Sequence, residues 1–137
     1  MEINGIAHTF LTSGDFPAAR RFYGQLLPYL GLTPVLDTED TYYCVGGRTA
    51  LGIRASERQE AGNRFDQSHS GLHHLCFRLR SRDDVDELHG FLVSIDARIV
   101  HGPREDGWAP GYYSVLFEDP DGVRLEANFV PGRGLLS

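Results

Sequence analysis

The sequence predicts an α+β fold made of two βαβββ modules that follow each other along the chain. The first observation is the order of the apolar patterns, which reads strand, helix and three strands, and then repeats. The second is an offset of 66 residues, which carries His8 onto His74 and also carries Phe22 onto Leu88 in the following helix. Because strand and helix keep one register, we interpret the two halves as an internal repeat. One four-stranded sheet with one helix leaves an apolar face uncovered, so the modules are expected to pack together.

The first module, residues 1–54, begins with a strand and a helix. Residues 4–12 alternate between two faces, as a strand covered on both sides does. Asp15 is the expected N-cap of the helix, Pro17 lies in its first turn and Gly31 ends it. Three further strands are expected at residues 33–36, 41–45 and 48–54, with a Gly46-Gly47 hairpin turn between the last two.

The second module, residues 71–131, repeats this order after a polar linker at residues 55–70. Ser81 is the expected N-cap of its helix, with Asp84 in place of the capping-box glutamate. The expected strands are residues 72–79, 97–100, 112–118 and 123–130, with the turn Asp119-Pro120-Asp121-Gly122 before the last one. Since the chain has the length of one ordinary domain, we expect a single domain over residues 1–137.

The composition argues against several classes of partner. The net charge is −6 and no cluster of Lys or Arg offsets it, which argues against binding to nucleic acid. No stretch of the sequence approaches the roughly 20 apolar residues of a membrane-spanning helix, and the first residues lack the pattern of a signal peptide. Cys44 and Cys76 are expected to be reduced thiols of a cytoplasmic protein. The expected partner is a small molecule.

The alternation of strand residues places three potential metal ligands on inner sheet faces. In the strand at 72–79 the odd-numbered positions from 75 onward are apolar, so His74 points to the opposite face. In the strand at 123–130 the odd-numbered positions are again apolar, so Glu126 points away from them. His8 holds in the first module the position that His74 holds in the second.

Two imidazoles and one carboxylate suit a single divalent ion such as Fe, Zn, Ni or Mn. Three protein ligands leave positions open for water and substrate, which is the property of a catalytic metal site. A carboxylate inside a sheet's hollow is costly unless it is paired or coordinated. An ion pair of Glu126 with Arg124 or Arg78 is the alternative, and the pattern alone leaves both interpretations open.

Two aromatic residues are candidates for the wall of a pocket. The stretch at residues 101–111 holds two prolines, three glycines and the tryptophan Trp108, and we interpret it as a candidate lid. Tyr113 is expected to line the pocket, where a phenol can donate a hydrogen bond to a bound oxyanion. Packing across the sheet is the commoner use of a strand tyrosine, and it stays the alternative.

Three segments carry a resemblance to a known family: residues 5–11 with Phe22-Tyr23, residues 73–77, and residues 117–126, a strand, a DPDG turn and a strand ending in Glu. Through them nearly the whole chain resembles the vicinal oxygen chelate superfamily, which includes glyoxalase I, bleomycin-resistance proteins, fosfomycin-resistance enzymes and extradiol dioxygenases. The resemblance implies that the two modules form an open barrel-like cup around a divalent metal. It also implies that His8, His74 and Glu126 are the ligands and that the protein is a homodimer.

Three positions depart from members of that family. Glyoxalase I has a fourth ligand, Glu or Gln, on the last strand of its first module, where this sequence has Gly52. The carboxylate pair that shuttles a proton in that isomerase is therefore absent here. Extradiol dioxygenases have a Tyr where this sequence has Leu116 and a His upstream of it, near Trp108, where this sequence has none. For an anionic substrate, as in the fosfomycin enzymes, Arg78 and Arg124 are the nearest candidate cations.

Two hypotheses of function follow. The first is a metal-dependent enzyme whose ion binds two oxygens of a small substrate and acts as a Lewis acid, in dioxygenase or lyase/isomerase chemistry, with Glu126 as the candidate catalytic residue. The second is a metal-free protein that sequesters a cationic drug in an acidic cleft, as bleomycin-resistance proteins do. The net charge of −6 agrees with the second, whereas two histidines and a glutamate at the ligand positions favour the first.

Overall fold

The computed structural model describes residues 1–134 and divides the chain into two compact units, Met1–Arg64 and Phe65–Ser137. The division falls inside the stretch expected to be a linker, residues 55–70. At the start of the second unit, the backbone N–H of Phe65 donates to the carbonyl of Asp121 at 2.7 Å, so residue 65 already belongs to the second unit. Each unit is described by itself below.

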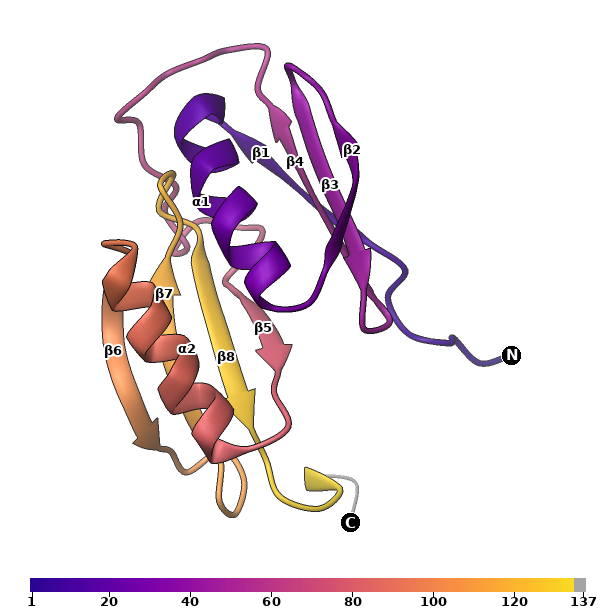
Figure 1. Cartoon of the computed structure of the whole chain (residues 1–137), viewed down its shortest axis with the longest axis vertical. Coiled ribbons are helices and arrows are strands. Elements are labelled where there is room, and N and C mark those ends of the chain that lie inside the picture. The colour runs from indigo at the N-terminus through magenta and orange to yellow at the C-terminus, as the bar shows by residue number, and fades with distance from the viewer. Residues whose placement is uncertain (135–137) are drawn as a thin grey trace. The chain divides into compact units, whose positions relative to one another are not determined.

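The first unit is one four-stranded sheet with one helix on one of its faces (Figure 1). Its elements are β1 (Thr9–Ser13), α1 (Phe16–Tyr29), β2 (Thr33–Asp37), β3 (Thr41–Gly46) and β4 (Thr49–Ala55). The strand order is β1-β4-β3-β2, in which β1 runs parallel to β4 and the other neighbours are antiparallel.

The second unit repeats this architecture. Its elements are β5 (Leu75–Arg78), α2 (Arg82–Ser94), β6 (Arg98–Glu105), β7 (Tyr113–Glu118) and β8 (Arg124–Phe129). The strand order β5-β8-β7-β6, with β5 parallel to β8, matches that of the first unit position by position. The prediction of an α+β fold with two βαβββ modules is therefore confirmed.

The helices begin where the sequence indicates. The carboxylate of Asp15 accepts a hydrogen bond from the backbone N–H of Ala18 at 3.3 Å, and the hydroxyl of Ser81 accepts one from the N–H of Asp84 at 3.1 Å. Each cap satisfies a backbone donor that the helix itself leaves without a partner. At the end of α1, Gly31 adopts a φ of +85°, the left-handed conformation that a glycine accepts without a steric penalty.

Each helix packs its apolar stripe on one face of its own sheet. In α1, Tyr23, Leu26 and Leu27 are fully buried, and they face a sheet surface that includes Leu51 and Ile53. This packing uses the face of odd-numbered β4 residues, because side chains alternate along a strand. Even-numbered residues such as Gly52 therefore belong to the other face.

The second unit follows the same rule. Val85, Leu88 and Leu92 of α2 are buried, as are Phe117 and Leu125 of the sheet. The alternation again assigns the odd-numbered residues of β7 and β8 to the helix, and the even-numbered ones to the opposite face.

Some strand bounds differ from expectation. The first strand begins at Thr9 and the fifth at Leu75, so His8 and His74 each lie directly before a strand. The strand expected at 97–100 continues to Glu105 and takes up half of the expected lid stretch. Gly102 and Pro103 suggested a loop there, but β6 is an edge strand with two register shifts, and such a strand tolerates proline because one side needs no ladder hydrogen bond.

The DPDG turn fixes how the last strand starts. The buried carboxylate of Asp119 accepts hydrogen bonds from the backbone N–H groups of Asp121 and Val123, both at 2.9 Å. Gly122 has a φ of +91°, which the turn requires and which residues with a side chain rarely adopt. The expected turn is thus present, and it sets the register in which β8 pairs with its neighbours.

None of the helices within residues 1–134 combines the length and the apolar character that crossing a membrane requires.

Candidate functional site

The candidate site of the second unit lies where β5 and β8 run side by side. In their register Cys76 is opposite Glu126, and His74 directly precedes β5. The neighbours of Glu126 on β8, Leu125 and Ala127, are fully buried on the α2 face, so Glu126 points to the other face. Its side chain is 12% exposed, which is a low value for a carboxylate.

Each oxygen of the Glu126 carboxylate has its own partner. Oε2 lies 3.2 Å from Nε2 of His74. Oε1 accepts a short hydrogen bond from the hydroxyl of Tyr112. The cluster therefore joins an imidazole, a carboxylate and a phenol on one sheet face.

The sequence left open a pairing of Glu126 with an arginine. Nε of Arg124 lies 3.8 Å from Oε1 of Glu118, the residue opposite it on β7. Within residues 1–134, no ion pair joins Glu126 to Arg124 or Arg78. The burial of Glu126 is thus compensated by His74 and Tyr112.

His74 has a second contact through its other ring nitrogen. Nδ1 of His74 lies 2.8 Å from Nδ1 of His73, so one ring donates a hydrogen bond and the other accepts it. The two rings meet edge to face, with centroids 5.0 Å apart. Histidines that bind metals usually use the second ring nitrogen for such a hydrogen bond, which fixes the orientation of the ring.

The neighbouring acidic groups are held in their neutral forms. Burial, together with the hydrogen bond to Glu126, raises the pKa of the Tyr112 hydroxyl above its usual range. Desolvation and then the charge of Glu126 raise the pKa of the Cys76 thiol to about 12. Neither group adds a negative charge to the cluster at pH 7, and Cys76 is a free thiol, as is the buried Cys44.

The imidazole of His74 and the carboxylate of Glu126 are suitable ligands for a divalent metal ion. An ion bound to an imidazole nitrogen and a carboxylate oxygen, each at about 2.1 Å, holds the two atoms about 3.0–3.4 Å apart. The separation of 3.2 Å between His74 and Glu126 falls in this range. On the same face, Oδ1 of Asn128 is buried without a hydrogen-bond partner in residues 1–134, a polar atom that a bound group could satisfy.

His8, the third expected ligand, belongs to the first unit. Its ring meets Phe10 edge to face at 5.6 Å and lies 6.5 Å from the ring of Tyr43. Within residues 1–134, no three side chains of the types His, Cys, Asp and Glu lie close enough together to hold a metal ion. Of the expected triad, the structure brings together His74 and Glu126.

The position of the missing fourth ligand is filled by an aromatic ring. A Cβ atom added to Gly52 would lie 2.2 Å from Cε1 of Phe10, and this ring in turn stacks on Tyr43 with centroids 5.3 Å apart. A side chain at position 52 would therefore require the ring of Phe10, which is 47% exposed, to move.

Tyr113 does not lie beside Glu126. Its hydroxyl donates to Asp86 of α2 at 2.6 Å, and the guanidinium of Arg82 lies 3.9 Å from its ring centroid. Strand alternation assigns Tyr113 to the helix face and Tyr112 to the face of Glu126. The sequence offers both tyrosines as candidates and favours Tyr113, whereas the structure has Tyr112 beside Glu126; counting along the strand from Leu116, which pairs with Glu126, would have selected Tyr112.

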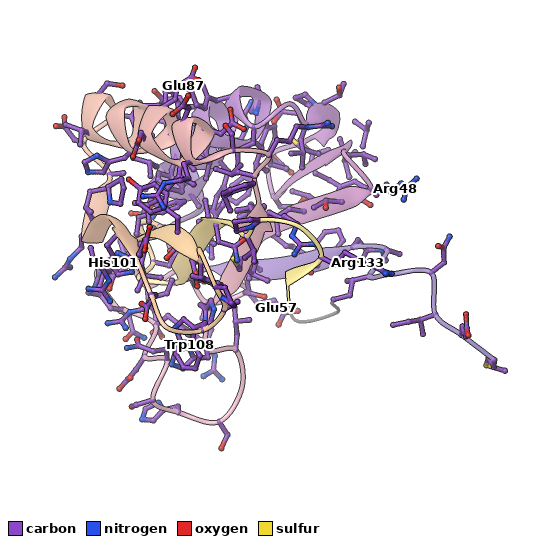
Figure 2. The ribbon with its side chains drawn as sticks, turned by 90° about the horizontal axis from the view of Figure 1, so that it is seen from below. Arg48, Glu57, Glu87, His101, Trp108 and Arg133 are labelled. Carbon is purple, nitrogen blue, oxygen red and sulfur yellow. The ribbon has the colours of Figure 1, made fainter. Side chains whose placement is uncertain are left out.

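The other expected pocket residues have separate locations. Trp108 is 73% exposed and lies in the loop that joins β6 to β7 (Figure 2). Arg78 follows Cys76 by two residues on β5 and pairs in register with Asn128, so it shares the face of Glu126. Arg124 shares that face too, two residues before Glu126, and interacts with Glu118.

Comparisons with known proteins agree with this architecture. The chain is 28% identical over 120 residues to the uncharacterized protein YqjT of Bacillus subtilis (strain 168), which covers 87% of this chain and 94% of YqjT. A solved structure from Bacillus halodurans matches with a TM-score of 0.78 and 24% identity, over 93% of this chain and 96% of that one. The lactoylglutathione lyase of Agrobacterium tumefaciens matches with a TM-score of 0.69 and 27% identity, over 93% of this chain and 95% of that one. The family model of the Glyoxalase/Bleomycin resistance protein/Dioxygenase superfamily matches residues 5–127, so the chain belongs to this superfamily.

Proposed function

We propose that this protein is a metal-dependent enzyme in which His74, Glu126 and His8 hold one divalent ion for dioxygenase or lyase/isomerase chemistry on a small substrate with two neighbouring oxygens. The observation that carries the proposal is the pairing of His74 with the largely buried carboxylate of Glu126 at 3.2 Å. The imidazole nitrogen and the carboxylate oxygen are both divalent-metal ligands, and their separation is one that a shared ion would allow.

The ligand set determines what the site can do. Two neutral imidazoles and one carboxylate leave an ion with net positive charge and with open positions. When bound, such an ion polarises substrate oxygens and stabilises the negative charge that develops on them. Glu126 contributes the anionic ligand, and His73 fixes the ring orientation of His74 through the contact between their Nδ1 atoms.

The first unit narrows the kind of proton transfer that is possible. Position 52 supplies no carboxylate for proton transfer, because it is a glycine under the ring of Phe10. Proton transfer in lyase chemistry of the kind named for the Agrobacterium relative would therefore depend on Glu126 of the second unit. Metal-reconstituted protein screened against catechols, glutathione hemithioacetals and fosfomycin would distinguish these reaction classes.

Metal analysis of untagged, full-length protein tests the proposal directly. We expect about one Fe, Zn, Ni or Mn per chain in the wild type, and loss of the ion in His74→Ala and Glu126→Gln. His69→Ala is the matched control, because the side chain of His69 is 82% exposed and lies outside this cluster. His8→Ala should weaken binding by about 100-fold or more, as the loss of one of three ligands does. Wild-type protein that stays free of metal after reconstitution would contradict the proposal.

Sequestration of a cationic drug without metal is the second candidate. The net charge of −6 and the stacked rings of Phe10 and Tyr43, which can take up a flat aromatic group, favour it. Drug protection in cells that is unchanged in the His74→Ala variant would support this candidate over the enzyme.

We also propose a homodimer. Light scattering of the purified protein should give twice the mass of one chain, and the mass of one chain would rule this out.

A further inference from the structure

We infer that Tyr112 is a positioning residue, which holds the carboxylate of Glu126 so that one oxygen faces His74. The role of this orientation in metal binding rests on the proposed function. The orientation itself is a property of the metal-free protein and can be tested without the metal.

The geometry assigns one carboxylate oxygen to each neighbour. The hydroxyl of Tyr112 donates to Oε1, and Oε2 is directed to Nε2 of His74 at 3.2 Å. A glutamate side chain has three rotatable bonds, and its entropy opposes a single orientation. A hydrogen bond from a phenol to a carboxylate is charge-assisted and about twice as strong as a neutral one, so it can fix this orientation.

The backbone around Tyr112 holds the phenol in place. The N–H of Tyr112 donates to the carbonyl of Ala109 at 3.0 Å, and the carbonyl of Tyr112 accepts from the N–H of Asp106 at 2.9 Å. Both partners belong to the loop that carries Trp108, so this loop determines where the hydroxyl lies. The residue is thus anchored independently of the carboxylate that it contacts.

A second polar side chain shares this face. Asn128 lies two residues after Glu126 on β8, and its buried Oδ1 has no hydrogen-bond partner within residues 1–134. Removing the phenol would leave Oε1 of the largely buried Glu126 carboxylate without its donor.

Tyr113 supplies a matched control. Its hydroxyl also donates to a carboxylate, that of Asp86 at 2.6 Å, but on the α2 face of the same strand. Tyr113→Phe and Tyr112→Phe each remove one phenol–carboxylate hydrogen bond from the same unit. A change confined to Tyr112→Phe therefore reports on the site rather than on the stability of the sheet.

The experiment measures Zn²⁺ affinity of the full chain by competition with a chromogenic chelator. Tyr112→Phe should bind Zn²⁺ about 10- to 100-fold more weakly than wild type, as is found when a group that orients a ligand is lost. Tyr113→Phe should bind it as wild type does. Crystal structures of the metal-free wild type and Tyr112→Phe proteins should show Glu126 directed to His74 in the first and turned away in the second.

The outcomes separate the two proposals. If the wild type binds no Zn²⁺, the metal-dependent function fails, while the two metal-free structures still decide the role of Tyr112. If Glu126 keeps its orientation in Tyr112→Phe, or if the affinity of that variant equals that of Tyr113→Phe, the positioning role is overturned.

Discussion

The two units share their topology but differ on the sheet face that the helix leaves free. The offset of 66 residues carries Phe10 onto Cys76. In register, Phe10 is opposite Gly52 in the first unit and Cys76 is opposite Glu126 in the second. The same pair of strands thus holds an aromatic ring over a glycine in one unit and a largely buried carboxylate opposite a cysteine in the other. At this strand pairing the first unit has an apolar surface and the second has ionisable side chains.

The helix-covered faces do not differ in this way. In the first unit Arg20 of α1 forms an ion pair with Asp37 of β2 at 2.6 Å and lies 4.0 Å from the ring centroid of Tyr42. In the second unit an arginine of α2 makes the same pair of contacts, with Glu105 of β6 and with the ring of Tyr113. Both units thus use an arginine of the helix to contact a carboxylate and a tyrosine ring, although the offset of 66 residues does not align Arg20 with Arg82.

The largest effect expected from this comparison is on the first unit. Gly52→Ala should lower the free energy of unfolding by about 1–3 kcal/mol, because the new Cβ overlaps the ring of Phe10 and forces it off Tyr43. In a Phe10→Ala background the same substitution should cost less than about 0.5 kcal/mol. Denaturant unfolding followed by circular dichroism measures both values.

Thr49→Ala, at an exposed position of the same strand, is the control. Equal destabilisation by Gly52→Ala in the two backgrounds would show that the backbone, rather than the ring, requires the glycine. The difference between the free faces would then have another origin.

The fold could be predicted because the spacing of apolar residues indicates the same order of strands and helix in both halves of the chain. The apolar stripe of each helix and the caps Asp15 and Ser81 depend on local spacing, which the sequence displays directly. Alternation along β8 also sufficed to place Glu126 on the free face. The extension of β6 through Pro103 was missed, because Gly and Pro indicate a loop unless the strand is known to lie at a sheet edge.

The contacts of the candidate site could be predicted only in part. That Tyr112 rather than Tyr113 meets Glu126 follows from alternation once the register of β7 and β8 is known. The ring of Phe10 over Gly52 depends on the pairing of β1 with β4, two strands separated by a helix and a hairpin. Sequence patterns do not specify such a register or the side-chain rotamer that uses it.

A smaller effect should reveal how similar the helix-covered faces are. Arg20→Met and Arg82→Met each remove a guanidinium from an aromatic ring, a contact worth about 0.5–1 kcal/mol. We expect both to destabilise, Arg20→Met the more, because Arg20 also binds Asp37 through two nitrogens, at 2.8 and 2.6 Å. Thermal unfolding measures the difference, with Arg21→Met on the exposed side of α1 as the control. A larger loss of thermal stability in Arg82→Met than in Arg20→Met would contradict this ranking of the two arginine contacts.

The smallest expected effect is a pH dependence of stability that comes from the ion pair between Arg20 and Asp37. The hydrogen bond from Arg20 lowers the pKa of Asp37 below its usual value. Stability from a carboxylate with a lowered folded-state pKa is fully present above the unfolded pKa, about 3.9, and is lost as the pH falls through the folded value. Wild type should therefore be more stable than Asp37→Asn at pH 6, and the gap should close below about pH 4. In an Arg20→Met background the gap should be absent at every pH, because the carboxylate then has no cation to hold its pKa down. Unfolding midpoints of the four proteins across pH 2–6 measure this difference in stability. If Asp37→Asn still destabilises the protein in the Arg20→Met background, the effect of Asp37 does not come from its ion pair with Arg20.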